Sequence, residues 1–307
     1  MKISILGTGA IGSLFAAGLA DKHDLTCIVK TEKHADAINS SGIKIAEKDG
    51  SLRLAHPKAL TDTNGMAPSD LVLIAVKAPA TAQAVSMHSS LFGKNTIVVS
   101  LQNGYGNYRD IESIVKPDHI IIGTTAQGAN ISPDGQVNHA GNGVTTIGAL
   151  LPESENSHEM LSSVAAVFND AGLETVITDD VEDAVIQKLF VNVGINAVCA
   201  LNDCQNKYIS SDPQLHSHAR KLVDEAVHIF ASAGRVYDAD TVWEHVESIA
   251  LATGENLCSM VQDMRNGRQT EILRINGAVV QLADELNLDA PENRAITEKI
   301  EDLSRRG

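Results

Sequence analysis

The most constraining feature of this sequence is its beginning, where a short apolar run leads directly into a glycine-rich turn. Residues 2–6 have the composition of a buried strand, and a helix-like stretch covers residues 11–22. In this setting the first glycine permits a tight turn, the second lets the backbone approach a pyrophosphate, and the third allows close packing of the helix. We therefore predict a dinucleotide-binding turn made by Gly7, Thr8, Gly9, Ala10, Ile11 and Gly12.

The first half of the chain alternates short apolar runs with helix-like segments. This alternation is typical of a parallel sheet whose strands are joined by helices. We expect strands at residues 2–6, 25–29, 71–76, 96–100 and 120–124, and helices at residues 11–22, 34–40, 80–91 and 108–115. Glycine-rich turns flank residues 137–139 and 144–147, which predicts a terminal antiparallel hairpin.

The pattern changes near residue 178. A helix at residues 157–171 and a strand at 175–177 precede the change, and 3.6-residue periodicity replaces the strand signals after it. Asp179 and Asp180 are suited to cap a helix reaching residue 201, and further helices are expected at 213–233, 239–251 and 270–286. We therefore predict an α/β protein with a Rossmann-type nucleotide-binding domain at residues 1–178 and an all-helical domain at residues 179–307.

Composition limits the classes of function. The 307 residues are 43% hydrophobic, enough for two packed domains, and a net charge of −15 gives no basic surface for nucleic acid. No apolar run is long enough for a membrane helix, and glycines interrupt the uncharged stretch near the N-terminus that otherwise resembles a signal peptide. We expect a cytoplasmic protein.

The four cysteines lack the spacing of a metal site or of a disulfide framework, so no metal site is expected. Reduced, buried thiols are predicted at Cys27, Cys199, Cys204 and Cys258.

The choice of cofactor depends on the end of the second expected strand. NAD sites usually carry a carboxylate there for the ribose 2′-hydroxyl, whereas this chain has Lys30 followed by Thr31. An ammonium group pairs with a 2′-phosphate, so we expect NADP; the alternative is an ordinary exposed lysine. Lys77 and Asn103 follow two later strands, where ligands of parallel sheets bind, although Asn103-Gly104 is also a common turn sequence.

A polar stripe marks the long helix expected after residue 179. Lys188, Asn192 and Asn196 recur every four residues among apolar neighbours, so they share one helix face. Asparagine is a poor helix former, and two in register favour the lining of a cavity over a solvated face. A second polar cluster follows at Asn256, Ser259, Asp263 and Glu271.

These segments, in this order, resemble the ketopantoate reductase (2-dehydropantoate 2-reductase) family over nearly the full length of the chain. The resemblance is carried by residues 7–12, Val76-Lys77, Gln102-Asn103-Gly104, Lys188-x3-Asn192-x3-Asn196, residues 256–263, Thr270-Glu271-Ile272 and Ile275-Asn276-Gly277. It implies reduction of ketopantoate to pantoate by NADPH, a step towards pantothenate and coenzyme A, at a site between the two domains.

The resemblance also implies roles for individual residues. Lys188 is expected to be the general acid and Glu271 its acidic partner, while the substrate is positioned by Asn103, Asn192, Asn196, Asn256 and Ser259. Some positions depart from the family pattern. Lys30 and Thr31 stand where many members have arginine, and Ala197 stands where proline is frequent. Glu271-Ile272 is followed by Leu273-Arg274, where the family commonly has an acidic residue after the isoleucine. These departures leave room for a family member that reduces a different 2-oxo acid.

The sequence is also compatible with two other functions. One is an NADPH-dependent reductase of another small 2-oxo acid on the same scaffold, and the other is a non-catalytic NADPH sensor whose helical half binds a protein partner. Lys188 and Glu271 argue against the sensor because a sensor needs no general acid. The apolar helices of the second half are also compatible with a homodimer interface or with packing inside their own domain.

Overall fold

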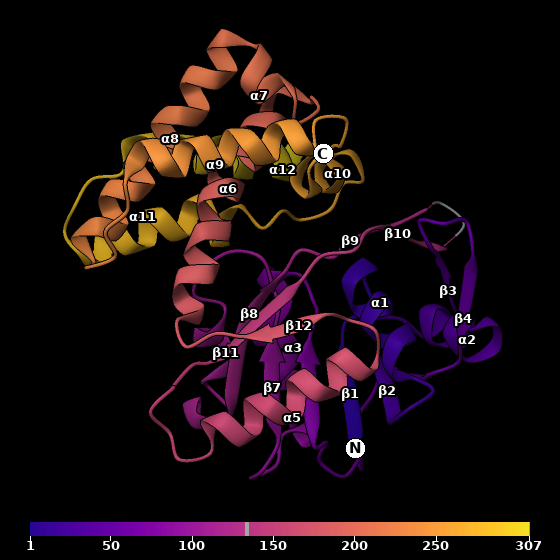
Figure 1. Cartoon of the computed structure of the whole chain (residues 1–307). Coiled ribbons are helices and arrows are strands. Elements are labelled where there is room, and N and C mark those ends of the chain that lie inside the picture. Colours follow the sequence, from indigo (N-terminus) through magenta and orange to yellow (C-terminus); the bar gives the residue numbers. More distant parts are fainter. Residues whose placement is uncertain (133–134, 307) are drawn as a thin grey trace. The chain divides into compact units, whose positions relative to one another are not determined.

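The computed structural model describes residues 1–132 and 135–306, and the chain divides into two compact units. Unit 1 comprises Met1–Gln102 and Asn107–Ala184, and unit 2 comprises Asn103–Gly106 and Val185–Gly307. The sheets lie in unit 1, whereas unit 2 is built of helices (Figure 1). The expected α/β architecture followed by a helical part is therefore confirmed, but no sequence signal separated the segment Asn103–Gly106 from its neighbours.

Unit 1 contains twelve strands and five helices in the described residues. Its strands are β1 (Lys2–Leu6), β2 (Asp24–Ile28), β3 (Ile43–Ala46), β4 (Leu52–Ala55), β5 (Lys58–Leu60), β6 (Leu71–Ile74), β7 (Ile97–Ser100), β8 (Ile120–Thr125), β9 (Gly128–Ile131), β10 (Val137–Gly141), β11 (Thr145–Ala149) and β12 (Thr175–Ile177). Its helices are α1 (Ala10–Leu19), α2 (Glu32–Ser41), α3 (Thr81–Met87), α4 (Tyr108–Ile111) and α5 (Ser157–Asp170).

The main sheet has the strand order β12-β11-β8-β7-β6-β1-β2-β5. The run from β8 to β5 is parallel, with Ile3 opposite both Leu25 and Leu71, so the expected parallel sheet is confirmed. Strand β11 pairs antiparallel with β8, which confirms antiparallel pairing at this end. The carboxyl ends of β1 and β6 meet at one edge, where ligands of such sheets bind.

The predicted hairpin near residue 140 is wrong. Strand β10 belongs to a second sheet of order β4-β3-β10-β9, whereas β11 lies in the main sheet. The connection is held against residue 126 instead of forming a hairpin turn: the Ala126 amide donates to Val144 O at 3.0 Å, and a Cβ on Gly143 would lie 2.2 Å from Ala126 O. A close backbone contact of this kind leaves no signal in the sequence.

Helix α1 lies between the main sheet, the second sheet and α5. Leu14, Phe15 and Leu19 on this helix are fully buried, and the Phe15 ring meets Phe168 of α5 edge to face at 5.1 Å between centroids. Replacing a buried phenylalanine with alanine typically costs about 3–5 kcal/mol. This packing fixes the helix that begins at the glycine-rich turn.

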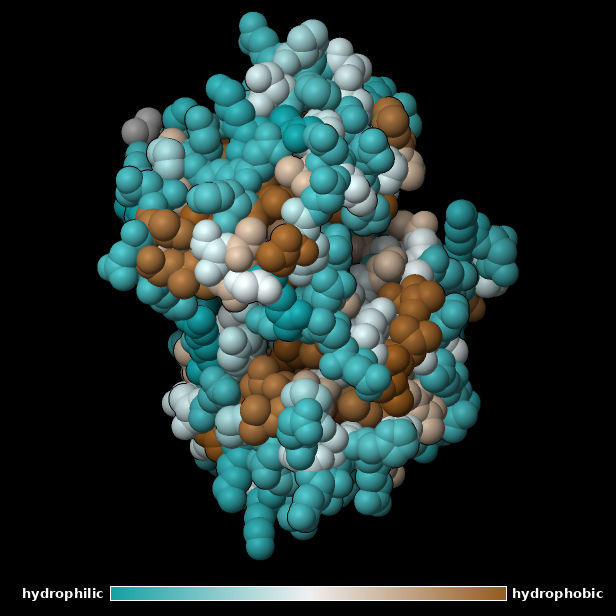
Figure 2. Space-filling model, turned by 60° about the vertical axis from the view of Figure 1, so that its left-hand side comes forward, coloured by the Kyte–Doolittle hydropathy of each residue, from teal (hydrophilic) through white to brown (hydrophobic). Residues whose placement is uncertain are grey.

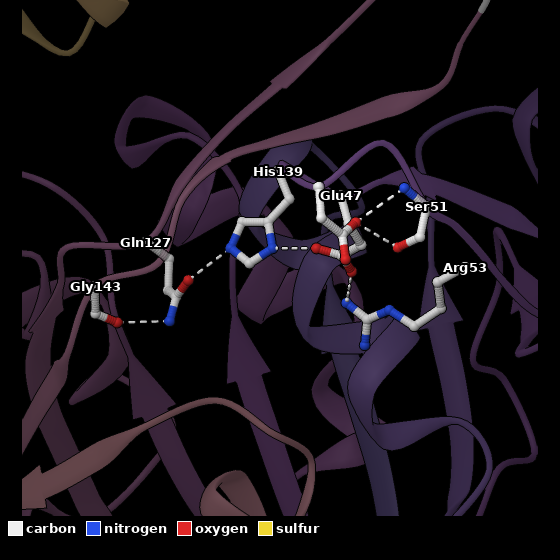
Figure 3. Close-up of polar contacts among 7 residues, drawn as sticks. Glu47, Ser51, Arg53, Gln127, His139 and Gly143 are labelled. Atoms are coloured by element: carbon white, nitrogen blue, oxygen red, sulfur yellow. Dashed lines mark hydrogen bonds and ion pairs between the residues drawn. The ribbon is translucent and has the colours of Figure 1, made fainter.

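A polar network joins the second sheet to the β10–β11 connection (Figure 3). His139 Nδ1 lies 2.7 Å from Glu47 Oε2, and His139 Nε2 lies 2.8 Å from Gln127 Oε1. The Gln127 amide in turn donates to Gly143 O at 2.5 Å, and the Glu47 carboxylate also pairs with Arg53 at 2.9 Å. Both ring nitrogens of the largely buried His139 face oxygen acceptors, so the ring is held on two sides.

Helix α6 (Val181–Asn202) leads into unit 2. The Asp183 amide donates to Asp180 Oδ1 at 3.1 Å, which confirms the predicted cap. The other helices are α7 (Tyr208–Ser211), α8 (Pro213–Ser232), α9 (Ala239–Ala252), α10 (Ser259–Arg265), α11 (Asn276–Glu285) and α12 (Pro291–Arg306). Phe190 and Phe230 meet edge to face at 5.6 Å in the core of this unit, and Tyr105 packs on Phe230 at 5.3 Å.

The single helix predicted at residues 270–286 is wrong. A short 3-10 turn at Ile272–Arg274 is followed by a break at Ile275, and α11 begins only at Asn276. Asn276 is fully buried, and its Nδ2 donates to Val193 O and to Asn293 Oδ1. Contacts with residues distant in sequence therefore decide where this helix begins.

Helix α6 also passes a length and composition test for a membrane span, but 61% of its most apolar window is buried within the fold, as in a core helix. Such a helix is weak evidence for a span.

Apolar side chains also reach the surface of both units, as the brown areas of Figure 2 show. Exposed apolar residues include Leu52, Val236 and Leu251. Of the four cysteines, three are buried as predicted, whereas Cys204 is only half-buried.

Candidate functional site

The glycine-rich turn joins β1 to α1 at the carboxyl edge of the main sheet. Gly7 has φ +95°, and a Cβ there would lie 2.7 Å from Val76 N, so the turn needs glycine on both conformational and steric grounds. A Cβ on Gly12 would lie 2.0 Å from Gly7 O, so this glycine lets α1 pack closely on the turn. The steric roles predicted for the first and third glycines are therefore confirmed.

Gly9 differs from its neighbours. Its φ is −71°, and a Cβ there would find no described atom within 4 Å outside its own chain neighbours, so the protein alone does not require glycine. The adjacent Thr8 is 5% exposed, and its Oγ1 has no hydrogen-bond partner in the described part of the chain. The open space at Gly9 and the Thr8 hydroxyl both lie at the start of α1, which begins with Ala10 and Ile11. This arrangement fits a bound pyrophosphate.

The two lysines expected at the cofactor both lie at the surface of unit 1. Lys30 is exposed just beyond β2, and the hydroxyl of the following Thr31 caps α2 by accepting from the His34 amide at 3.3 Å. Lys77 is exposed just beyond β6, and Gln102 joins that strand end to its neighbour by donating to Val76 O at 2.8 Å. Thr31 therefore has a structural task that its position in the sequence did not reveal.

The catalytic pair expected from the sequence lies in unit 2 together with Asn103. Glu271 is 5% exposed, and Asn103 Nδ2 donates to its Oε2 at 3.4 Å. Burial of the Lys188 ammonium lowers the pKa of the lysine from 10.5 to about 8, and the nearby Glu271 carboxylate acts in the opposite direction. The structure thus brings together three residues that lie up to 168 positions apart in the sequence.

The backbone turn that follows Glu271 holds the segment around Asn103. The Tyr105 amide donates to Arg274 O at 2.8 Å, and a Cβ on Gly104, which has φ +90°, would lie 2.2 Å from the same oxygen. Glycine at position 104 is therefore needed for the close approach of these two segments. The Asn-Gly sequence does form a turn, and this turn is also what carries Asn103 to Glu271.

Helix α6 carries the other predicted polar residues. Asn196 is 5% exposed, and its backbone oxygen accepts from the Cys258 thiol at 3.6 Å, which joins α6 to the start of α10. Ser259 is the first residue of α10, and Asn256 is exposed just before it. Asn192 Nδ2 is buried and has no hydrogen-bond partner among residues 1–132 and 135–306. An orphan donor on this helix face suits an anionic or carbonyl ligand.

One polar residue of this unit was not predicted. Asn206 is 6% exposed and donates from Nδ2 to Thr253 Oγ1 at 2.9 Å, and its amide donates to Asn256 O at 3.0 Å. Its Oδ1 is buried without a partner in the described residues. Asn206 lies outside the four-residue stripe of α6, in a connection where asparagine is common, so spacing gave no signal for it.

Comparison with known proteins identifies the family. The protein-family model described as "Ketopantoate reductase PanE/ApbA" matches residues 3–152 of the chain. The family model of the C-terminal part matches residues 180–304. A 2-dehydropantoate 2-reductase of Halobacterium salinarum is 33% identical over 311 residues, covering 100% of both chains, and one of Pyrococcus abyssi is 35% identical over 297 residues, covering 95% of this chain and 94% of its own.

Solved structures also match the whole chain, and one of them is a PanE/ApbA family ketopantoate reductase from Ralstonia eutropha, with a TM-score of 0.89 and 25% identity, covering 100% of this chain and 99% of that one. The ternary structure of D-mandelate dehydrogenase with NADH and anilino(oxo)acetate matches with a TM-score of 0.93 and 26% identity, and it covers 100% of this chain and 99% of that one. Because the two family models together match most of the chain, and because relatives above 30% identity span nearly all of it, the chain belongs to the ketopantoate reductase family of oxidoreductases.

Proposed function

We propose that this chain is an NADPH-dependent 2-dehydropantoate 2-reductase, which reduces ketopantoate to pantoate in the synthesis of pantothenate and coenzyme A. The observation that carries the proposal is the grouping of Asn103, Lys188 and Glu271, in which burial lowers the pKa of the lysine to about 8. An amine with that pKa is protonated at neutral pH and gives up its proton easily, as a general acid must. The names of the relatives support this choice of substrate.

In this proposal Lys188 donates the proton, and Glu271 keeps Lys188 protonated before the reaction. The nicotinamide cofactor, when bound, supplies hydride to the 2-oxo carbon, and negative charge then develops on the oxygen. Lys188 Nζ stabilises that charge and donates a proton to the same oxygen. Glu271 opposes the effect of burial on the lysine pKa, so it keeps the ammonium form populated before the reaction. Asn103 holds the Glu271 carboxylate through its Nδ2.

The substrate is held, in this proposal, by neutral hydrogen-bonding side chains. The orphan Nδ2 of Asn192 is a suitable donor to the substrate carboxylate, since it gains a partner only when a ligand binds. Asn196, Asn256 and Ser259 complete the set, and Asn103 orients the reacting end. Amides and hydroxyls bind a carboxylate without competing with Lys188 as acids.

The cofactor is assigned to unit 1. The backbone of residues 7–12 and the Thr8 hydroxyl would bind the pyrophosphate, Lys77 would approach the nicotinamide half together with Asn103, and Lys30 would pair with a 2′-phosphate. The open space at Gly9 and the orphan Thr8 hydroxyl support the first assignment. Residues 1–178 would thus bind the cofactor and residues 179–307 the substrate. We place the enzyme in the cytoplasm; a homodimer stays a prediction that light scattering would test.

A second candidate differs in substrate and cofactor. The match to D-mandelate dehydrogenase bound to NADH favours a reductase of another 2-oxo acid that uses NADH. Lys30 is a point charge without the planar fork of arginine, and its neighbour Thr31 is already engaged as a helix cap, so selection against NADH would rest on one side chain.

The deciding experiment follows nicotinamide absorbance with NADPH or NADH and a panel of ketopantoate, 2-oxoisovalerate and phenylglyoxylate. We expect rapid oxidation only with NADPH and ketopantoate. A preference for either acid that lacks the 4-hydroxyl would overturn the pantoate assignment. Binding of NADPH without oxidation by any of the acids would favour the sensor.

The Lys30→Asp variant tests the choice of cofactor separately. Because only NADPH carries a 2′-phosphate, the substitution should raise the KM for NADPH more than that for NADH. Equal changes in both constants would remove Lys30 from this role, and the same substitution at the nearby exposed Lys33 serves as the control.

A further inference from the structure

Two fully buried asparagines join four helices of unit 2. Asn276, the first residue of α11, donates from Nδ2 to Asn293 Oδ1 at 2.9 Å and to Val193 O of α6 at 3.4 Å. Asn293, on α12, donates from its own Nδ2 to Leu222 O at 3.1 Å and to Glu225 Oε2 at 2.8 Å, both on α8. Both asparagine side chains are fully buried. The two amides therefore connect α6, α8, α11 and α12 through hydrogen bonds.

The point where Asn276 reaches α6 lies within the polar stripe of that helix. Val193 directly follows Asn192, whose Nδ2 is the orphan donor, and it comes three residues before Asn196. Helix α6 also packs closely against α8 and α9 at this point, because a Cβ on Gly194 would lie 2.9 Å from a side chain of each. Asn276 therefore contacts α6 at the turn that carries two of the predicted substrate residues.

The chain just before Asn276 carries Glu271. Glu271 is followed at once by the 3-10 turn Ile272–Arg274, and the Arg274 amide donates to Glu271 O at 2.9 Å. The short segment from Glu271 to Asn276 is therefore held by its own backbone hydrogen bonds. Asn103 is joined to the same segment, because its Nδ2 donates to Glu271 Oε2 at 3.4 Å. A side chain that fixes Asn276 on α6 thus fixes Glu271 and Asn103 relative to that helix as well.

The Asn276 amide is costly for the fold. Its Oδ1 is buried and has no hydrogen-bond partner within residues 1–132 and 135–306. A buried acceptor without a donor loses its hydration and gains nothing in return, so an apolar side chain would fill this position more favourably. Core packing alone does not explain an asparagine at position 276, whereas the two hydrogen bonds that its Nδ2 donates do explain it.

We propose that Asn276 is a positioning residue, which holds the segment of Glu271 against the turn of α6 that carries Asn192. Asn293 anchors the Asn276 amide on the other side. The effect on catalysis rests on the proposed function, in which Asn192 binds the substrate carboxylate while Asn103 orients the reacting end. A shift between the two segments would misplace the 2-oxo carbon, and a misplacement of about 1 Å can lower a rate by about 100-fold.

The Asn276→Ala variant removes the Nδ2 donor and adds no atoms to the core. In steady-state kinetics with ketopantoate we expect kcat to fall by about tenfold or more, because the reacting end is no longer held in place. The KM for the acid should change by less than about threefold, since Asn192 still binds the carboxylate. The affinity for NADPH should be unchanged, because the turn of residues 7–12 belongs to the other unit.

The Thr297→Val variant is the matched control. Thr297 Oγ1 donates to Asn293 O at 2.7 Å, so this variant loses one buried hydrogen bond of the same network without changing the Asn276 amide. It should lose stability and keep the kcat of the wild type. The fluorescence of Trp243, which is buried in unit 2, gives the folded fraction by which each kcat is corrected.

The Asn276→Asp variant separates the donor from the shape of the side chain. An ionised carboxylate at this position would face Val193 O and Asn293 Oδ1 and donate to neither. Burial favours the neutral acid, whose hydroxyl donates to one of these oxygens. The kcat of Asn276→Asp relative to the wild type should therefore recover as the pH falls. A kcat as low as that of Asn276→Ala at every pH would refute the assignment to the Nδ2 donor.

Hydrogen exchange followed by mass spectrometry tests the anchoring without substrate. Peptides that cover residues 271–275 and 103–106 should exchange faster in Asn276→Ala than in the wild type or in Thr297→Val. Unchanged exchange, or an equal loss of kcat in Thr297→Val, would refute the positioning role. A wild type that reduces no 2-oxo acid, but whose exchange responds to Asn276→Ala, would refute the proposed function alone. An active wild type whose kcat survives Asn276→Ala would refute the positioning role alone.

Discussion

Replacing Lys188 with methionine should stabilise the protein while removing its activity. The residue keeps part of its surface exposed, but its ammonium end is buried, and burial lowers the lysine pKa from 10.5 to about 8. The lowering of the lysine pKa from 10.5 to about 8, at about 1.4 kcal/mol for each step of one in pKa, corresponds to about 3.5 kcal/mol of free energy lost on burying the charge. Methionine has a similar length and carries no charge, so Lys188→Met should recover up to about 3.5 kcal/mol at pH 7.

The pH dependence of this gain has a definite sign. Below pH 8 the lysine holds its proton in both the folded and the unfolded state, and the full cost is present. Between pH 8 and 10.5 the folded state releases the proton while the unfolded state keeps it, so the cost falls and the wild type becomes relatively more stable. The advantage of Lys188→Met should therefore shrink to about 1 kcal/mol at pH 9.5.

The measurement is urea unfolding followed by the fluorescence of Trp243. It is the only tryptophan of the chain and is 5% exposed in unit 2, so its signal reports on the unit that holds Lys188. Lys221→Met, at an exposed lysine of α8, is the control and should change stability by less than about 0.5 kcal/mol. A destabilised Lys188→Met protein, or a gain that does not shrink at high pH, would refute the buried-ammonium argument.

Three further results are expected. Glu271→Gln removes the carboxylate that raises the pKa of Lys188. In a pH profile of kcat/KM, the pH above which reduction slows should therefore fall from about 8 to a lower value, and an unchanged midpoint would contradict this. Gly9→Ala should leave thermal stability nearly unchanged but weaken nucleotide binding in calorimetry, whereas Gly12→Ala, whose Cβ would lie 2.0 Å from a backbone oxygen, should lower the melting temperature sharply. Glu47→Gln, which removes the charge facing an imidazole and a guanidinium, should destabilise the protein by about 1–3 kcal/mol in thermal denaturation; a stability equal to the wild type would show that the network contributes nothing.

The elements that the sequence predicted well are those whose signal is local. Strand β1, the turn and α1 follow from apolar runs and glycines within twenty residues, and Asp180 caps α6 as its position indicated. The four-residue spacing of Lys188, Asn192 and Asn196 predicted a shared helix face without any structure. In each case the residues that determine the element lie within the element or next to it.

The predictions that were wrong depend on contacts between distant residues. Strand β10 pairs with β3, some ninety residues earlier, and with the preceding β9, so the following strand β11 was the wrong partner. Helix α12 was not predicted, because its cap comes from Glu225 of α8, whose carboxylate accepts from the Glu292 and Asn293 amides. The second sheet was also missed, since its strands have only four or five residues and β3 and β4 carry charged side chains.

Helix α6 shows why the candidate site was easier to predict than its surroundings. Its composition alone resembles a membrane span, because most of the helix is buried in the core and must be apolar. Against that background each polar residue has a cost: the buried ammonium of Lys188 loses hydration, and Asn192 Nδ2 has no hydrogen-bond partner in the described residues.

Packing does not explain these costs, since leucine or methionine would fill the same positions more favourably. A ligand that gives Asn192 an acceptor and takes a proton from Lys188 does explain them. Lys30 differs from Lys188 because it is exposed, so its charge stays hydrated and has no burial cost. Its role therefore has to be established by the comparison of NADPH with NADH, whereas that of Lys188 can be tested on the protein alone, through the stability of Lys188→Met.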